Sequence, residues 1–583
     1  MWKLASGALI FLLLMVVSGS SFAASPSGTT IPPATQIIDS TSGTWTVDGS
    51  GVCYLNGVQA GGCAHVTTLL FYQGAIYANT TAYGWWQWVG NQFQQVAGDP
   101  RRPGVVGSWS KVIPLANNPV AAVLLRTGKV LTWSSNTQTT FEGEIGTTPS
   151  QTYVGLFDPN FQTSTTTLVT AGLADMFCPG IAIMPDGTVV VNGGSSSPRT
   201  TIYSPSSNSW TVANYMNIPR GYNSDVLLQD GTVLTIGGSW SGALGDKIGE
   251  VWSASTWQTR SGISAVPIAG PDPEDQSLGY IYRGDNHAWL FALSNQRILH
   301  AGPSAEMHWI TTSGQGSIVS AGFRNDDPYS MNGNAVLYDV GKVFKTGGAP
   351  GYQDAFATTN TYLIDASKPG QNPTVSTLAP MNYARAFSNS VVLPTGQVLV
   401  VGGQTYASPF SDDRAVLVPE LWDPVSQQFS LMAQMQTPRT YHSTALLLPD
   451  GRVFVGGGGL CGTCNTNHMT VEIFSPPYLF NSDGTAATRP SITLAPSSAN
   501  RGTNITVATS ASNLTFALVR MGAVTHTVDN DQRRVPLLIN SSSRNSYSLP
   551  IPSDAGIVVP GYYMLFAINP NGTPSVGTII KII

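Results

Sequence analysis

A tight turn that leads into a buried strand and then a diglycine recurs along the middle of the chain. A clear copy is Asp230-Gly231-Thr232-Val233-Leu234-Thr235-Ile236-Gly237-Gly238, in which an Asp-Gly turn feeds a strand rich in β-branched residues. Seven copies, two of them weaker, occupy residues 127–131, 186–194, 230–238, 297–302, 341–348, 396–403 and 450–458. This repeat constrains the fold more than any other feature, because each copy predicts a similar small sheet.

The copies are spaced about 45 to 65 residues apart, close to the kelch period of a β-propeller. Seven four-stranded blades would occupy residues 100–485. A propeller closes its own sheet edges and leaves an axial channel where loops converge. The chain has 61 Gly and 39 Pro and only 10% charged residues, a composition typical of turn-rich β structure. We therefore predict an all-β protein built on a seven-bladed kelch-type β-propeller.

Two flanking segments lie outside the repeats. Residues 486–583 alternate Ser/Thr/Asn turns with short apolar strands, which predicts a C-terminal immunoglobulin-like β-sandwich. Residues 36–97 predict a small N-terminal β module rich in hairpin signals. Its aromatic residues Trp85, Trp86 and Trp88 could stack on glycans or form the core of the module, and the core role is the favoured interpretation.

The N-terminus predicts secretion. Lys3 precedes an apolar run and then small residues that end at Ala23-Ala24, the pattern of a secretory signal peptide over residues 1–23. No later segment is apolar over the roughly 18 residues that a membrane-spanning helix needs. The net charge of −5 with few charged residues indicates neither a nucleic-acid nor a membrane partner. We expect a secreted monomer.

Five cysteines suggest two disulfides and one unpaired thiol. In an oxidising compartment close neighbours pair, which predicts Cys53–Cys63 and Cys461–Cys464. Cys461-Gly-Thr-Cys464 could also be a redox or metal motif, although no second cysteine pair accompanies it. Cys178 is then left alone. An unpaired thiol in a secreted protein indicates a partner chain, a buried apolar role or special chemistry.

Four segments outside the repeats carry residues suited to metal chemistry. They are Asp175-Met176-Phe177-Cys178-Pro179-Gly180, Arg220-Gly221-Tyr222-Asn223-Ser224, Arg439-Thr440-Tyr441-His442-Ser443 and residues 525–534, which include His526. In chain order they resemble the galactose oxidase family of copper-radical oxidases. The resemblance runs from about residue 173 to the C-terminus. It does not extend to residues 36–97, where fungal members carry a larger carbohydrate-binding sandwich.

The resemblance implies one copper ion and a built-in radical cofactor. Tyr222, Tyr441, His442 and His526 would be the copper ligands. Tyr222 would be joined to Cys178 by a thioether, and Trp240 would stack over the modified ring. Two imidazoles and two phenolates suit copper(II) and leave a position open for substrate.

The implied reaction converts a primary alcohol to an aldehyde and reduces dioxygen to hydrogen peroxide. This oxidation removes two electrons while copper changes by one, so a tyrosyl radical on Tyr222 would hold the other oxidising equivalent. Tyr441 would act as the general base. The family's sugar contacts map to Arg283, Gln353, Phe387 and Phe141, and favour the C6 hydroxyl of galactose or galactosides. Arginine's planar fork suits vicinal hydroxyls, and the aromatic rings offer an apolar wall. Arg283 could instead hold loops together, and Gln353 could be a surface amide.

Two other functions stay open. A radical oxidase of simple alcohols or aldehydes would share the copper residues and differ in pocket shape. A kelch protein that only binds glycans or partners would not need Cys178, Tyr222, Tyr441, His442 and His526 together. The remaining histidines, His65, His287, His300, His308 and His468, match no ligand motif and are interpreted as structural.

Overall fold

The computed structural model describes residues 23–583 except 81–82, 97, 142–150, 171–173 and 271–282. All but the last residue of the predicted signal peptide lies outside the described residues. The chain forms two compact units, residues 1–101 and residues 102–583. No helix in the described part is long and apolar enough to cross a membrane. The helical turns are α1 (Pro103–Val106), α2 (Val266–Ala269), η2 (Gly194–Ser196) and η4 (Pro477–Leu479).

The first unit is a β module of two antiparallel sheets that share one hydrophobic core. The larger sheet contains, in spatial order, β1 (Thr29–Ile31), β6 (Val66–Tyr72), β7 (Ala75–Thr80), β8 (Gly84–Val89) and β9 (Gln92–Gln95). The smaller contains β2 (Ile37–Ile38), β3 (Thr44–Val47), β4 (Cys53–Leu55) and β5 (Val58–Gln59). The sequence predicts a module that begins at residue 36. Strand β1 lies before that residue and belongs to the larger sheet, because it pairs with β6.

Tryptophans of this module contribute to its core. Trp85 is buried, and Trp88 packs edge-on against Trp45 and Phe93 with ring centroids 5.1 and 5.0 Å away. Trp86 is half-buried. The predicted disulfide Cys53–Cys63 is present and lies in the same core. These contacts favour the core interpretation of the aromatic residues over a glycan-stacking one.

Besides a two-stranded sheet of β30 (Ala355–Phe356) and β35 (Tyr406–Ala407), the second unit contains seven antiparallel sheets of four or five strands, counted within the described residues between 108 and 475. Their strands run from inside to outside as follows: β12 (Ala121–Leu124), β13 (Val130–Trp133), β14 (Thr152–Asp158), β15 (Thr163–Val169); β16 (Gly180–Ile183), β17 (Val189–Asn192), β18 (Thr200–Ser204), β19 (Ser209–Ala213); β20 (Ser224–Leu227), β21 (Val233–Ile236), β22 (Gly249–Ser253), β23 (Thr256–Arg260); β24 (Trp289–Leu293), β25 (Arg297–Gly302), β26 (Glu306–Thr311), β27 (Ser317–Phe323); β28 (Asn334–Asp339), β29 (Lys342–Thr346), β31 (Thr361–Asp365), β32 (Thr374–Thr377); β33 (Ala386–Val392), β34 (Val398–Gln404), β36 (Glu420–Asp423), β37 (Gln428–Leu431); and β38 (Ser443–Leu447), β39 (Val453–Gly457), β40 (Thr470–Ser475).

The arrangement of these sheets is compatible with a closed seven-bladed propeller. Innermost strands contact each other in succession, as in β16 with β20 and β33 with β38, and β38 returns to β12. The last sheet takes its outer edge from the start of the propeller segment, where β10 (Ser108–Trp109) and β11 (Ile113–Pro114) pair with β40. Strands β10 and β11 thus join the two ends of the propeller segment. The predicted all-β fold class is confirmed.

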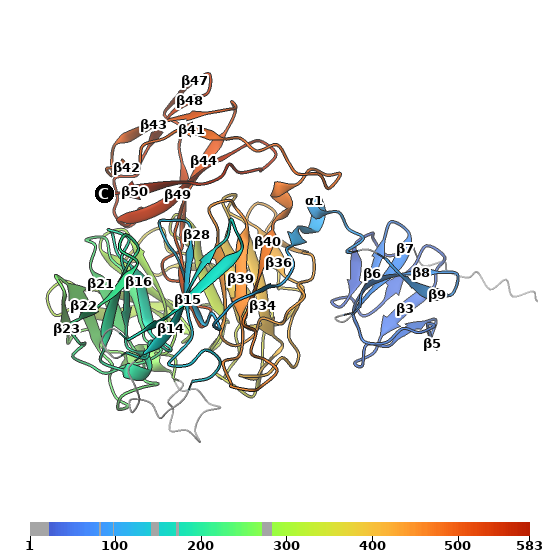
Figure 1. The fold of residues 1–583 in the computed structure, drawn as a ribbon, viewed down its shortest axis with the longest axis horizontal. Coiled ribbons are helices and arrows are strands. Elements are labelled where there is room, and N and C mark those ends of the chain that lie inside the picture. Colours follow the sequence, from blue (N-terminus) through green and yellow to red (C-terminus); the bar gives the residue numbers. More distant parts are fainter. Residues whose placement is uncertain (1–22, 81–82, 97, 142–150, 171–173, 271–282) are drawn as a thin grey trace, which may run out of the picture. The chain divides into compact units, whose positions relative to one another are not determined.

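The C-terminal domain is a two-sheet sandwich. One sheet contains β41 (Ile492–Leu494), β43 (Asn504–Thr509), β48 (Ser546–Pro550) and β47 (Ser541–Ser543), and the other β42 (Ser498–Ala499), β50 (Thr578–Ile582), β49 (Gly561–Ile568), β44 (Thr515–Arg520) and β46 (Arg534–Leu537). In Figure 1 it lies over one end of the propeller. The contact is with the interstrand turns of the repeats, in which Pro394 and Pro449 lie. The Gly577 N–H donates to Pro449 O at 2.7 Å, and Arg534 Nε donates to Pro394 O at 2.8 Å.

One segment of the C-terminal domain enters the propeller axis. Strand β45 (Ala523–Thr525) pairs with the innermost strand β12. Further along, Asn530 Nδ2 donates to Asp225 O in β20 and Gln532 Nε2 donates to Ser390 O in β33, both at 3.0 Å. The segment therefore hydrogen-bonds to the inner strands of several blades and carries His526 into the channel.

Buried arginine–glutamate pairs hold the loops that enter three of the inner strands. Arg220–Glu250, Arg385–Glu420 and Arg439–Glu472 have N–O distances of 2.9, 3.0 and 3.4 Å, and all six side chains are fully buried. The arginines lie two positions before Tyr222, Phe387 and Tyr441. The same ion pair thus supports three loops that carry expected site residues.

Replacing Arg385 by methionine should destabilise the fold strongly. The variant Arg385→Met leaves Glu420 as an uncompensated buried charge, a loss of about 3–5 kcal/mol. Thermal and denaturant unfolding should register the loss. The matched control is Arg452→Met, whose partner Asp450 is 2.6 Å away and partly exposed; for such a pair the expected loss is about 0–1 kcal/mol. Equal losses in the two variants would contradict this role of the buried pair.

Candidate copper site

Site residues come from equivalent positions just before the innermost strands. Cys178 precedes β16, Tyr222 precedes β20 and His442 precedes β38, with φ angles of 59°, 63° and 69°. Non-glycine residues adopt this left-handed conformation only rarely, and such outliers gather at functional sites. His287 and Asn332 precede β24 and β28 in the same way, Phe387 is the second residue of β33, and all three share the conformation. Six blades therefore each place one such residue at the same end of the channel.

Backbone hydrogen bonds link these positions around the axis. The Tyr222 N–H donates to Cys178 O, the His287 N–H to Tyr222 O, and the Phe387 N–H to Asn332 O, each at 2.9 Å. The loops therefore position their neighbours, and the blades fix the geometry of the site.

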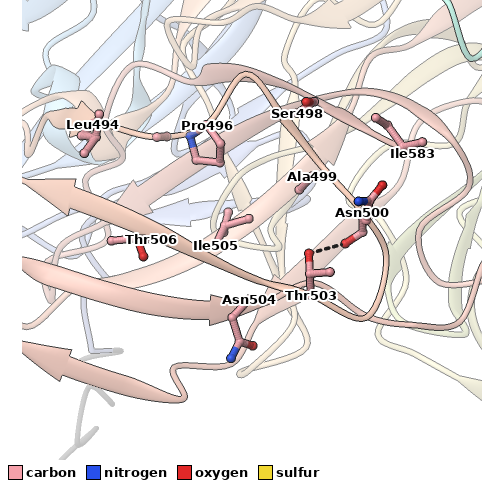
Figure 2. A pocket seen from close by; sticks show the side chains of 11 residues that line it. Leu494, Pro496, Ser498, Ala499, Asn500, Thr503, Asn504, Ile505, Thr506 and Ile583 are labelled. Carbon is pink, nitrogen blue, oxygen red and sulfur yellow. Dashed lines mark hydrogen bonds between the residues drawn. The ribbon is translucent and has the colours of Figure 1, made fainter.

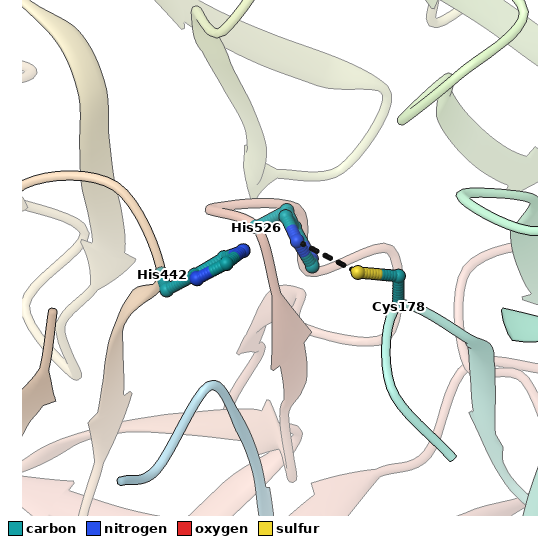
Figure 3. Close-up of side chains that lie close together, drawn as sticks. All are labelled: Cys178, His442 and His526. Carbon is teal, nitrogen blue, oxygen red and sulfur yellow. Dashed lines mark hydrogen bonds between the residues drawn. The ribbon is translucent and has the colours of Figure 1, made fainter. Parts of the chain in front are cut away.

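Two phenols, two imidazoles and a thiol meet at this end of the channel. The Tyr222 and Tyr441 hydroxyl oxygens are 2.6 Å apart. Cys178 Sγ lies 3.3 Å from His526 Nε2, and Figure 3 shows His526 between His442 and Cys178. One ligand atom each from Cys178, His442 and His526 lies within 4.8 Å of the others, and all three residues are buried. The structure brings together all five residues that the family resemblance places at the copper site, which are Tyr222, Tyr441, His442, His526 and Cys178.

Hydrogen bonds orient both imidazoles through their Nδ1 atoms. His442 Nδ1 lies 2.5 Å from the carbonyl oxygen of Gly459 and must donate to it. His526 Nδ1 lies 2.8 Å from Thr525 Oγ1. The Nε2 atom of His442 is left buried without a hydrogen-bond partner. An Nδ1–H that donates to a carbonyl fixes the tautomer whose Nε2 lone pair is free for a metal.

Burial keeps both rings neutral. It lowers the pKa of His442 to about 3 and the pKa of His526 well below its ordinary value, with nearby imidazoles adding to the shift for His526. Burial raises the pKa of the Cys178 thiol well above its usual range, opposed in part by a hydrogen bond with Tyr222. Neutral imidazoles are the form that binds metals, because protonation would occupy the lone pair.

The donor set fits copper. Two imidazole nitrogens and two phenol oxygens are the N,O set that copper(II) favours. The unpartnered Nε2 of His442 supports the assignment independently, since buried polar atoms in native proteins are nearly always satisfied. The site therefore fits a single copper ion held by His442, His526, Tyr222 and Tyr441.

Aromatic rings surround Tyr222. Trp240 stacks on it with ring centroids 4.5 Å apart and an interplanar angle of 10°, as expected from the sequence. His287 packs on the Tyr222 ring at 4.3 Å and on the His526 ring at 4.7 Å. The Tyr222 ring is thereby enclosed and 2% exposed.

The expected substrate residues differ in their surroundings. Phe387 is buried and packs edge-on against Tyr441 at 5.1 Å. Phe141 is partly exposed and stacks on Phe177 at 5.0 Å. Gln353 is half-buried. The Arg283 guanidinium donates to Ser239 Oγ at 2.7 Å and to Asp285 at 3.0 Å, and its side chain is 19% exposed. Arg283 thus already makes loop contacts.

Three neighbours of the copper residues were not assigned a site role from the sequence. The Tyr352 hydroxyl donates to the Tyr441 hydroxyl at 2.8 Å, and Phe410 packs edge-on against Tyr441 at 5.1 Å. The third is His287, which sequence analysis interprets as structural.

A sequence signal could have found His287. Cys178, Tyr222, Asn332, Phe387 and His442 each lie nine positions before the turn glycine of their repeat, and His287 stands at the same offset from Gln296, where glycine is replaced. Tyr352 and Phe410 lie outside this register.

Two family models match the chain. One, described as galactose oxidase-like, early set domain, matches residues 489–582. The other, described as glyoxal oxidase N-terminus, matches residues 353–478. The fold and the buried donor set define a copper-dependent oxidoreductase built on a β-propeller.

Similar proteins share this class. A galactose oxidase of Gibberella zeae is 43% identical over 84% of this chain and 73% of its own length. An aldehyde oxidase of Arabidopsis thaliana is 26% identical over 70% of this chain and 72% of its own. A solved structure, described as a fungal alcohol oxidase with catalytic diversity among the AA5 family in complex with copper, has a TM-score of 0.77 and 39% identity. It matches 82% of this chain and 99% of its own. The chain belongs to the galactose oxidase family of copper-radical oxidases.

Proposed function

We propose that this protein is a secreted oxidase that converts a primary alcohol to the aldehyde and dioxygen to hydrogen peroxide, with the C6 hydroxyl of galactose or galactosides as the favoured substrate. The observation that carries the proposal is the pair of phenol oxygens 2.6 Å apart beside two neutral imidazoles and a buried thiol. This placement provides both a metal site and an oxidisable tyrosine next to a sulfur atom.

Copper, when bound, supplies a Lewis acid and a one-electron acceptor. Tyr441 takes the hydroxyl proton of the alcohol, a role that its contact with the Tyr352 hydroxyl supports because that bond orients its oxygen. Tyr222, in its oxidised radical form, takes the hydrogen atom from carbon. Trp240 and His287 cover the Tyr222 ring and exclude water from it.

We further propose a thioether between Cys178 and the ring of Tyr222. Its formation joins sulfur to a ring carbon and releases the thiol hydrogen and one ring hydrogen. The two electrons and two protons set free pass to dioxygen, which is reduced to hydrogen peroxide when copper is present. The thiol is free, buried and hydrogen-bonded to Tyr222. A sulfur substituent donates electron density to the ring and stabilises the radical.

Arg283, Gln353, Phe387 and Phe141 are proposed to contact the sugar. Phe387 and Phe410 place aromatic rings beside Tyr441, and aromatic rings suit the apolar face of a sugar. A second candidate function is the oxidation of simple alcohols or aldehydes. It is favoured by the engagement of Arg283 with Asp285 and Ser239, and by the similarity to an alcohol oxidase and an aldehyde oxidase.

The variant Arg283→Ala should weaken galactose oxidation more than oxidation of a small primary alcohol. Loss of hydrogen bonds to a charged donor costs about 1.5–3 kcal/mol, so kcat/KM for galactose should fall more than about tenfold. Measuring kcat/KM for galactose and for the small alcohol in the same preparation gives the difference between the two losses. Equal losses would show that Arg283 acts only through Asp285 and Ser239, as a structural residue.

A peroxide-coupled assay of the copper-loaded protein over sugars, primary alcohols and aldehydes tests the substrate class. Galactose and galactosides should be oxidised well and glucose poorly. Higher kcat/KM for a simple alcohol or aldehyde than for every galactoside would replace the proposed substrate by the second candidate.

Secretion and a monomeric state complete the proposal. The two disulfides, Cys53–Cys63 and Cys461–Cys464, are those that spacing predicts, and disulfides persist in oxidising compartments. Dioxygen and a small alcohol are the expected partners.

A further inference from the structure

Acceptor motifs for N-linked glycans gather in the C-terminal domain. The motif Asn-x-Ser/Thr, with x other than Pro, is the acceptor in secreted proteins. The chain contains five, at Asn79, Asn504, Asn513, Asn540 and Asn571. Four of them lie between residues 504 and 573. We propose that the C-terminal sandwich carries N-linked glycans at these four asparagines and that Asn79 carries none. The inference rests on the proposed secretion.

All four asparagines of the C-terminal domain are exposed. Asn504 begins β43, where alternate residues face solvent, so that Thr506 of the same motif is exposed too. Asn504 and Thr506 are among the residues that line an open surface groove of the C-terminal domain (Figure 2). A glycan on Asn504 would therefore leave from the exposed face of β43.

The other three motifs lie in connections between strands. Asn513 lies between β43 and β44, Asn540 between β46 and β47, and Asn571 in the turn between β49 and β50. Glycans are bulky and solubilising and need surface positions of this kind. Leu538 and Ile539, which are 78% and 41% exposed, directly precede Asn540. A glycan there would cover an apolar pair beside the exposed edge strand β47, which could otherwise pair with another chain.

Asn79 differs in every respect. It lies inside β7, pairs across the sheet with Trp85 and is 4% exposed. A glycan on its amide nitrogen would have to pass through the packed module. Asn79 is therefore an internal control with the same sequence motif in the same chain.

The four sites lie away from the copper residues. The C-terminal domain contacts the propeller at the interstrand turns, whereas Cys178, Tyr222 and His442 lie at the opposite ends of the innermost strands. Residues 523–532, which begin with β45, run along the inner strands between the two ends. Glycans on the sandwich leave the substrate side open, so their removal should not change kcat/KM.

The modification is a transfer of oligosaccharide from a lipid-linked diphosphate donor. The asparagine Nδ2 forms a bond to the first sugar carbon and gives up one proton. The sugar–phosphate bond breaks and the lipid diphosphate leaves. No oxidant or reductant is required.

The test uses the full chain secreted from a eukaryotic host. Peptide N-glycosidase converts each linked asparagine to aspartate, which peptide mass mapping detects. We expect aspartate at all four positions, asparagine at position 79, and unchanged oxidase activity after treatment. Thr506→Ala should keep Asn504 and lose its glycan. Unmodified asparagine as the main species at any of the four positions, or conversion at Asn79, overturns the proposal.

This test is independent of the oxidase chemistry. A secreted protein that oxidises alcohols without glycans would contradict the glycosylation proposal alone. A glycosylated, copper-loaded protein that oxidises no alcohol or aldehyde would contradict the proposed function alone.

Discussion

The variant Cys178→Gly is expected to fold and bind copper but to lose nearly all turnover. The imidazoles and phenols remain in place, and glycine adopts the left-handed backbone conformation at this position without a steric cost. The radical, however, loses the sulfur that stabilises it. Copper content, thermal unfolding and kcat on the best alcohol measure the three parts of this expectation. Wild-type turnover in Cys178→Gly would rule out a role for sulfur.

The wild-type protein provides the complementary result. A thioether resists thiol reductants, whereas a disulfide does not. After copper loading in air, full reduction and alkylation, the four cysteines of the two disulfides should take the label and Cys178 should not. Peptides that contain Cys178 and Tyr222 should travel together, lighter by two hydrogens than their sum. Stoichiometric labelling of Cys178 in active enzyme would contradict the thioether.

The variant His526→Ala is expected to lose copper. It removes one of the two proposed nitrogen ligands. Changing even an outer-shell partner typically costs about 10–100-fold in metal affinity, so the affinity should fall by more than about 100-fold. The β45 segment should stay in the channel, because Asn530 and Gln532 still bond to the inner strands. Copper titration followed by spectroscopy measures the loss.

His468→Ala is the matched control. His468 bonds to Asp412 at 2.8 Å and is not in the copper cluster, so this variant should keep wild-type copper affinity. If His526→Ala bound copper as tightly as His468→Ala, the C-terminal domain would not supply a ligand.

The sequence predicts the propeller well because its signal is periodic. Each copy of the repeat predicts the same hairpin. Seven copies at a regular spacing identify the fold even though two of them match the pattern only weakly. Copper ligands can be proposed from the sequence because their motifs match one family in chain order. Strand β1 joins the N-terminal module by pairing with β6, and so short a strand leaves no clear signal in the sequence.

Contacts made across blades could not be predicted from the sequence. His287, Tyr352 and Phe410 come from three different parts of the chain and meet only when the ring is formed. The contacts of Arg283 with Ser239 and Asp285 also depend on how two loops pack. Packing therefore decides which polar side chains are free for substrate, and local sequence does not report it.

The most direct test of the central claim is the stoichiometry of a single reaction. The copper-loaded, air-oxidised protein is mixed with a primary alcohol, and dioxygen uptake, hydrogen peroxide and aldehyde are measured together. We predict equal amounts of all three, with no activity in the copper-free protein or in Tyr441→Phe, which lacks the proton acceptor. Aldehyde formed without peroxide, or no product from any alcohol or aldehyde by protein that holds copper at this site, would contradict the account.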